Sequence, residues 1–124
     1  MIDLTDVVDV FGECDFDLTN STHHNTELIS SVTGEYIYIQ NTIGLNSSRN
    51  SYIRVVLHPD TDLSRFSGLR GVRATPNRIV HDSNCIQFPT RQHTGETEIH
   101  YGIALNINSL NELRAFLKCF NTTV

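Results

Sequence analysis

The sequence has no apolar run that approaches the roughly 20 residues needed to span a bilayer. Its first residues lack the basic and apolar segments of a secretory signal peptide. The cysteines are an odd number at wide spacings (Cys14, Cys85 and Cys119), which is typical of reduced thiols rather than a disulfide framework. We therefore expect a cytoplasmic protein without membrane association. Its 124 residues suffice for one globular domain, residues 1–124, whose core needs no disulfide or metal to be stable.

Short motifs for metal binding and catalysis are also missing. The histidines and cysteines form no His-x-His, His-x-x-x-His or Cys-x-x-Cys spacing, and no serine lies in a Gly-x-Ser-x-Gly motif. No glycine-rich loop matches a phosphate cradle, and no EF-hand spacing occurs. We therefore expect no metal, no cofactor and no catalytic residue. A metal site built from separate strands by His58, His81 and His100 with Asp82 stays open, and Cys85 is a weak candidate nucleophile.

Positive charge is absent from the first part of the chain. Residues 1–48 contain eight acidic residues and no Lys or Arg, whereas residues 49–91 contain seven Arg against three Asp. A pI near 5.6 and a single Lys argue against direct binding of nucleic acid. This polarity exceeds what solubility requires. Either the two segments neutralise each other within the fold, or the acidic segment meets a cationic partner, and the sequence favours neither interpretation.

The clearest structural pattern lies near the C-terminal end. Residues 99–107 alternate between large apolar and small or polar side chains, which predicts a strand with one buried face. Ser109 and Glu112 then form a capping box. One apolar helical stripe follows, at Leu110, Leu113, Phe116, Leu117 and Phe120. The pattern predicts a strand followed by an amphipathic helix that packs on a sheet.

The rest of the chain is predicted to consist mainly of short strands joined by turns. A first helix is expected at residues 4–11, with Thr5 as its cap and Gly12 at its end. Loops are expected at 19–26 and 68–77. The further predicted elements are strands 13–18, 28–32, 35–40, 52–58 and 78–81, the last paired with 85–88, and a short helix capped by Thr61. The predicted fold class is α+β: a single twisted, mostly antiparallel sheet of about seven strands, with the C-terminal amphipathic helix packed on one face.

The acidic segment suggests the leading functional hypothesis. Like charges without a nearby cation destabilise a fold slightly, which indicates compensation from outside. Two tyrosines on strand 35–40, expected to be exposed, would be favoured interface anchors. We expect a small acidic cytosolic binding protein of the immunity-protein or antitoxin kind, which neutralises a cationic partner such as a nuclease or toxin. Its candidate partner-binding residues are Asp9, Glu13, Asp15, Asp17, Glu35, Tyr36 and Tyr38.

The alternative hypothesis is a small enzyme or ligand-binding domain that acts on an anionic substrate. Arginines around a glycine-bearing loop could bind carboxylates or phosphates. His100 projects from the polar face of the last strand, where it could transfer protons or be an ordinary solvated residue. The candidate residues are Arg65, Arg70, Arg73, Arg78, His81 and His100. A nucleic-acid or phosphate binder that uses the same arginines ranks last.

Overall fold

The computed structural model describes residues 1–47, 50–92, 95 and 97–122. Within these residues the chain forms two α-helices, one short 3-10 helix and seven strands. In chain order they are α1 (Leu4–Glu13), β1 (Phe16–Ser21), β2 (Asn25–Ser30), β3 (Tyr36–Gln40), β4 (Ile53–Leu57), η1 (Leu63–Phe66), β5 (Val72–His81), β6 (Thr90–Gln92), β7 (Glu98–Ile107) and α2 (Leu110–Asn121).

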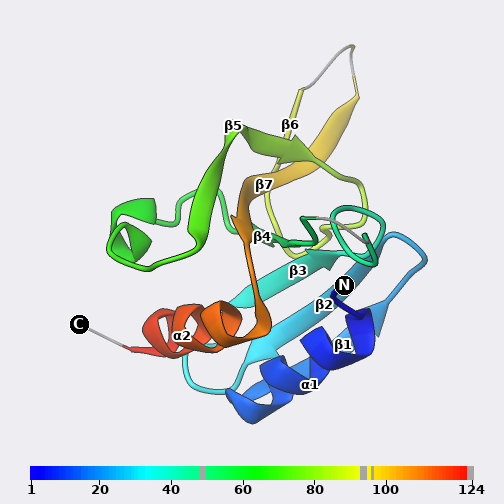
Figure 1. Cartoon of the computed structure of the whole chain (residues 1–124). Helices are drawn as coiled ribbons and strands as arrows, with labels where there is room; N and C mark the ends of the chain where they lie inside the picture. Colours follow the sequence, from blue (N-terminus) through cyan, green and yellow to red (C-terminus); the bar gives the residue numbers. More distant parts are fainter. Residues whose placement is uncertain (48–49, 93–94, 96, 123–124) are drawn as a thin grey trace.

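The strands form one antiparallel sheet in the order β1-β2-β3-β4-β7-β5, and β6 also pairs with β7. Among the described strands, β1 and β5 are therefore the two ends of the main strand order. Figure 1 shows α1 and α2 side by side below the twisted sheet, with η1 at the far end near β5. The predicted α+β class, with the C-terminal helix packed on the sheet, is confirmed.

The predicted strand–helix unit at the C-terminal end is also confirmed. Alternate residues of β7 (Ile103, Leu105 and Ile107) face the main core, and α2 buries its apolar stripe on the same side. The Ser109 hydroxyl accepts a hydrogen bond from the Glu112 backbone N–H at 3.2 Å, as a capping box requires. The Glu112 carboxylate accepts from the Ser109 hydroxyl at 3.2 Å, where the prediction had it accept from the Ser109 backbone N–H.

The first helix is longer than predicted. Its N-cap is Asp3, whose carboxylate accepts from the Thr5 backbone N–H at 3.2 Å, so the prediction of Thr5 as the cap was wrong. The helix also continues past Gly12, because its buried side extends to Cys14, which is the C-cap. Asp15 then adopts φ = 67° and turns the chain into β1. The predicted strand 13–18 therefore begins only at Phe16.

Two of the predicted loops are largely strand, and the short helix has a different cap. Strands β1 and β2 occupy most of residues 19–26, and β5 begins at Val72, within the predicted loop 68–77. The first prediction failed because backbone hydrogen bonds build a ladder without large apolar side chains. The second rested on Gly68, Gly71 and Pro76, but β5 begins directly after Gly71 and continues through residue 76. The short helix spans only Leu63–Phe66, and Asp62 rather than Thr61 caps it.

The sheet face opposite the helices is partly covered, not solvated. Residues 85–88 form turns instead of the predicted strand, and the predicted pairing with 78–81 is replaced by pairing between β5 and β7. Cys85 and Phe88 pack on Tyr38 and Val56 in a second, smaller apolar cluster. A Cβ at Gly102 would lie 3.0 Å from the Phe88 ring, so the glycine lets that segment approach the strand. We refer to this side as the second face of the sheet.

Candidate functional site

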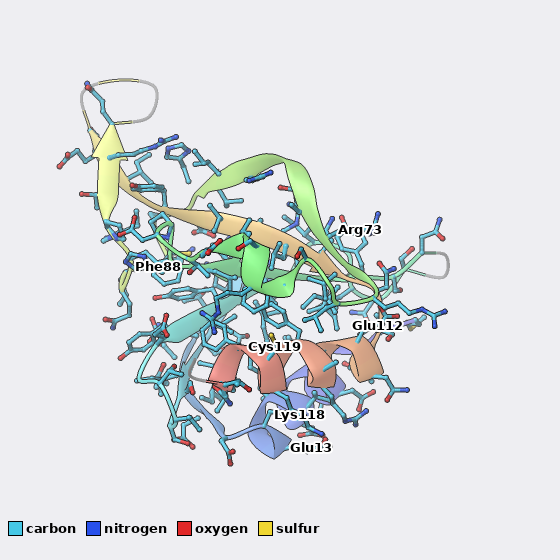
Figure 2. The ribbon with its side chains drawn as sticks, turned by 90° about the vertical axis from the view of Figure 1, so that its left-hand side faces the viewer. Glu13, Arg73, Phe88, Glu112, Lys118 and Cys119 are labelled. Atoms are coloured by element: carbon cyan, nitrogen blue, oxygen red, sulfur yellow. The ribbon has the colours of Figure 1, made fainter. Side chains whose placement is uncertain are left out.

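The acidic segment and the arginine-rich segment meet in the middle of the sheet, where β3 pairs with β4, but β1 of the first and β5 of the second lie at opposite ends of the strand order. The acidic segment contains α1 and β1, whereas several arginines lie in or beside β5. Figure 2 shows Glu13 at the helical layer and Arg73 on the far side of the molecule. The ion pairs between described residues are Glu13–Arg114 at 2.8 Å and His58–Asp60 at 4.0 Å. Neither joins an acid of residues 1–48 to an arginine of residues 49–91, so these pairs do not support the mutual-neutralisation interpretation.

We define the acidic edge as the exposed side chains of Asp9, Asp15, Asp17 and Glu35, together with Glu13. The Ser31 backbone N–H and hydroxyl both donate to the Asp15 carbonyl oxygen, at 2.8 and 2.9 Å. These bonds bring the turn between β2 and β3, which carries Glu35, next to the start of β1. Figure 1 shows α1 running alongside β1. Helix, strand and turn thus contribute carboxylates around the β1 edge of the sheet, with Asp17 on the opposite face of β1 from Phe16 and Leu18.

Two large apolar side chains lie on the same elements. Leu18 of β1 is 55% exposed, and Val32 of the β2–β3 turn is 52% exposed. The alternation of residues 13–18 groups Leu18 with Cys14 and Phe16 on one face of the predicted strand. Within β1 only Phe16 of that face is buried, because β1 is an edge strand. Val32 was missed, although its position just before the Thr33–Gly34 turn was the available signal. Exposed apolar groups among charges are a common feature of protein-binding surfaces.

Glu13 differs from the other acids of this edge because it has a cation. The Arg114 guanidinium of α2 donates to both carboxylate oxygens, at 2.8 and 3.4 Å. These hydrogen bonds hold the pKa of Glu13 below its usual value, and they raise the pKa of Arg114. Asp9, Asp15, Asp17 and Glu35 have no such ion pair within the described residues. Four of the five predicted acids therefore keep unpaired carboxylates on the surface.

The two predicted tyrosines lie on the second face of the sheet, and only one of them is accessible. Tyr36 is half-buried beside the small apolar cluster. Tyr38 is 1% exposed, so the prediction that it is exposed was wrong. The segment that contains Cys85 and Phe88 covers Tyr38, and the Phe88 ring lies edge-on to the tyrosine ring at 5.0 Å. Tyr38 is therefore a core residue in this fold.

A buried carboxylate, which the sequence reasoning did not single out, explains the position of Tyr38. Glu27 is 4% exposed, and its carboxylate accepts from the Tyr38 hydroxyl at 2.5 Å and from the Thr19 hydroxyl at 2.7 Å. The Gln87 backbone N–H donates to the Tyr38 oxygen at 3.1 Å. Burial, reinforced by the hydrogen bond to Glu27, raises the pKa of Tyr38. No local sequence signal marks Glu27, because its burial depends on a segment about 60 residues away.

Cys85 belongs to this buried network. The Asn25 side-chain amide donates to the Asp82 carboxylate at 2.8 Å and contacts the Cys85 sulfur at 3.7 Å. Cys85 is fully buried, and burial raises the pKa of its thiol, with the Asp82 and Glu27 charges adding to the effect. A nucleophilic cysteine needs access and a stabilised thiolate. Its surroundings therefore give Cys85 a structural role.

The predicted arginines do not converge on one site. Arg65 stacks on Phe66 and donates to the Phe120 carbonyl oxygen at 3.0 Å, which caps the end of α2. Arg73 donates to the Asn108 side chain at 3.1 Å, and Arg70 is exposed. Arg78 alone lines a pocket beside η1.

The histidines of the alternative hypothesis are also separated from that pocket. His100 Nδ1 lies 2.6 Å from the Phe88 carbonyl oxygen, on the second face. His81 accepts from Arg91 at 2.9 Å near the β6–β7 pair. His58 accepts from the Asp60 backbone N–H at 3.0 Å. No group of three or more His, Cys, Asp or Glu side chains among the described residues is arranged to hold a metal ion.

The sequence matches no protein-family model, and no curated protein matches it either. Of the helices in the described part of the chain, none has the length and apolar character to cross a membrane.

Proposed function

We propose that the protein binds a cationic protein partner through the acidic edge, in the manner of a small inhibitor that neutralises a basic nuclease or toxin. The observation that carries the proposal is the set of exposed carboxylates of Asp9, Asp15, Asp17 and Glu35, which form no ion pair with a described residue. Lys118 lines the same surface hollow as Glu13 and Asp15, but it forms no ion pair with them. A basic surface placed against the carboxylates would therefore gain electrostatic attraction that no ion pair of the described residues uses.

The geometry of the acidic edge supports a protein partner rather than a small cation. The carboxylates come from a helix, a strand and a turn, and no metal-binding group of side chains occurs among the described residues. Leu18 and Val32, each more than half exposed, supply apolar contact area on the same strand and turn. In protein interfaces, apolar contacts supply much of the affinity, while complementary charges accelerate encounter and select the partner. Immunity-type inhibition of a basic enzyme requires this combination.

The experiment that tests the proposal compares two variants of equal net charge. One carries Asp15→Asn and Asp17→Asn on the acidic edge, and asparagine tolerates the positive φ of residue 15. The control carries Asp60→Asn and Glu98→Gln, which remove two exposed carboxylates elsewhere. Wild type, edge variant and control are each used to capture partners from native lysate at low salt. The affinity of a captured basic protein for each of the three is then measured. We expect wild type and control to bind the basic protein, the edge variant to bind it more weakly, and high salt to release it.

Two results would contradict the proposal. Equal affinity of the edge variant and the control would mean that net charge alone, rather than this surface, binds the partner. Capture of acidic proteins only would show that the carboxylates are not the recognition element. A second edge variant, Leu18→Ser with Val32→Ser, separates the apolar contribution, because it should weaken binding without changing its salt dependence.

A further inference from the structure

A pocket lies beside η1, bordered partly by the core side chains of Phe66, Ile103 and Leu105. It has a volume of about 640 Å³ and lies between η1 and the β5–β7 pair. Its apolar lining includes Leu63 and Phe66 of η1 and Ile103 and Leu105 of β7. Small-molecule sites have volumes on the order of 300 to 1,000 Å³ and are mostly apolar with a few polar groups. This pocket has both properties.

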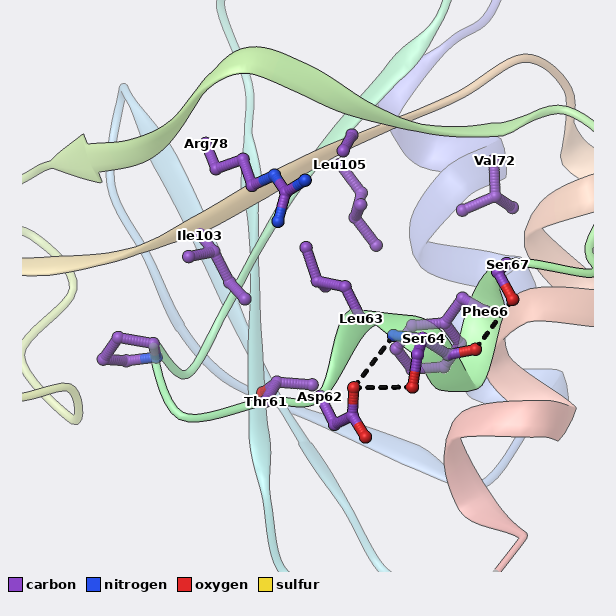
Figure 3. A pocket seen from close by; sticks show the side chains of 12 residues that line it. Thr61, Asp62, Leu63, Ser64, Phe66, Ser67, Val72, Arg78, Ile103 and Leu105 are labelled. Carbon is purple, nitrogen blue, oxygen red and sulfur yellow. Dashed lines mark hydrogen bonds between the residues drawn. The ribbon is translucent and has the colours of Figure 1, made fainter.

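Arg78 brings a positive charge to the pocket because β5 is irregular. The register of β5 against β7 shifts between Ala74 and Ile79, in a stretch that includes Pro76, which has no backbone N–H to donate. Bulges of this kind redirect side chains. Figure 3 shows the Arg78 guanidinium turned into the space bordered by Ile103, Leu105 and Leu63. Neither ion pair in the described residues involves Arg78, so its charge is available to a ligand.

Asp62 places a negative charge at the other side of the pocket. One of its carboxylate oxygens accepts from the Ser64 backbone N–H at 3.0 Å and from the Ser64 hydroxyl at 2.7 Å. These bonds lower the pKa of Asp62, so the group stays ionised at neutral pH. Asp62 and Arg78 form no ion pair with each other. A ligand with one negative charge would meet Arg78, whereas a second negative charge would meet repulsion from Asp62.

We propose that this pocket binds a small monocarboxylate with an apolar body, whose carboxylate is held by Arg78 and whose body lies on Leu63, Phe66, Ile103 and Leu105. An arginine fork matches the two oxygens of a carboxylate. The apolar body removes pocket surface from water. This site is independent of the acidic edge, so it would be a second ligand site.

The test is an NMR titration of the ¹⁵N-labelled protein with 4-phenylbutyrate, with the neutral 4-phenylbutanol as the matched probe. We expect shifts of η1, β5 and β7 amides with the carboxylate, and at least about tenfold weaker binding of the alcohol, because it cannot form charge-assisted hydrogen bonds. Arg78→Gln should weaken 4-phenylbutyrate binding by a similar factor, and Arg78→Lys by less, since it keeps the charge without the fork. Arg70→Gln, which removes an exposed arginine outside the pocket lining, should bind as wild type.

Selection by Asp62 is tested with a dianion. Phenylsuccinate should bind more weakly than 4-phenylbutyrate, and Asp62→Asn, which keeps a capping side chain, should narrow that difference. Equal binding of the acid and the alcohol, unchanged affinity of Arg78→Gln, or shifts confined to other parts of the protein would overturn the proposal. The amide spectrum of each variant shows directly whether the variant is folded. Weaker ligand binding by a variant with a well-dispersed spectrum therefore reports on the site and not on a loss of folding.

Discussion

At the acidic edge, the carboxylates of Asp15 and Asp17 are exposed without an ion pair to a described residue. At the β5 end, two arginines are held by neutral oxygen atoms: Arg65 by the Phe120 carbonyl and Arg73 by the Asn108 amide. Neutral acceptors fix the direction of a guanidinium without cancelling its charge. Arg73 lies on β5, at the opposite end of the strand order from β1. Arg65 instead lies 5.8 Å from the Phe120 ring, which also packs on Phe16 of β1. Neither ion pair between described residues joins the acidic segment to the arginine-rich segment, so internal neutralisation by such pairs is not seen in the described part of the chain.

Both ends depend on the same residue of α2, and its removal should have the largest effect. The Phe120 ring lies 5.9 Å from the Phe16 ring of β1 and 6.4 Å from the Phe66 ring of η1. Phe120→Ala should lower the free energy of unfolding by about 3–5 kcal/mol, because it leaves a cavity in the core. Urea denaturation measures the change. The control is Lys118→Ala on the exposed side of the same helix, which should change the free energy of unfolding by no more than about 0.5 kcal/mol. An equally small change for Phe120→Ala would contradict the conclusion that this side chain supports both ends of the sheet.

The buried pair of Tyr38 and Glu27 lies between the two ends, on the second face. Tyr38→Phe removes the donor to the Glu27 carboxylate and should destabilise the protein by about 1.5–3 kcal/mol near neutral pH. The control is Tyr36→Phe, since no hydrogen bond of that hydroxyl is found within the described residues and Tyr36 is half-buried. Equal effects of the two substitutions would show that the hydrogen bond contributes nothing.

The same pair predicts a pH dependence. The folded state raises the pKa of Tyr38, so above the ordinary tyrosine pKa of about 10 the unfolded chain loses this proton while the folded protein keeps it. The stabilisation is complete below that pH and declines as the pH rises. Consequently, the stability gap between wild type and Tyr38→Phe should narrow between about pH 9 and about pH 11. Denaturant titrations at both values measure it, and a constant gap would contradict the account.

A smaller effect is expected at the entry to β5. Gly71 has φ = 75°, and a Cβ there would lie 0.9 Å from Glu112 Oε2. Gly71→Ala should therefore cost about 1–2 kcal/mol for the left-handed backbone alone, and it would also displace the carboxylate of the capping box. Gly68→Ala is the matched control, because its Cβ would meet no atom within 4 Å. Thermal unfolding compares the two, and equal midpoints would contradict the prediction.

The smallest effect concerns Arg114, which neutralises one acid of the acidic edge. Arg114→Gln should destabilise the protein slightly, because it removes the hydrogen bonds that lower the pKa of Glu13. That stabilisation is present above the ordinary glutamate pKa and is lost as the pH falls through the lowered folded value. The difference in melting temperature from wild type should therefore shrink in acid to what the Arg114–Asn111 hydrogen bond contributes. Binding of a cationic partner should strengthen, and a weakening would contradict the assignment of the acidic edge.

Local patterns predicted the elements better than their arrangement. Alternation in residues 99–107 and the Ser109–Glu112 box predicted β7 and α2, because period and capping are short-range properties. The pairing of 78–81 with 85–88 failed because β5 instead pairs with β7. Strand partners distant in sequence leave no local signal.

The same limit applies to the candidate sites. The charge segregation of the sequence was visible, but its meaning depended on strand order, which places β1 and β5 at opposite ends. The exposure of Tyr38 was predicted wrongly because alternation identifies two faces and does not say which segments cover them. The arginine pattern marked Arg78 as a candidate anion ligand, but the pocket that Arg78 lines also needs η1 and β7, which are distant in sequence.

The most direct test of the separated charges is an NMR titration of the ¹⁵N-labelled protein with a short oligolysine peptide at low salt. The account predicts amide shifts around Asp9, Asp15, Asp17 and Glu35, with β5 unaffected, and a clear reduction in the Asp15→Asn, Asp17→Asn variant. Shifts of equal size around Asp60 and Glu98, or shifts that the variant leaves unchanged, would contradict the existence of a specific cation-binding edge.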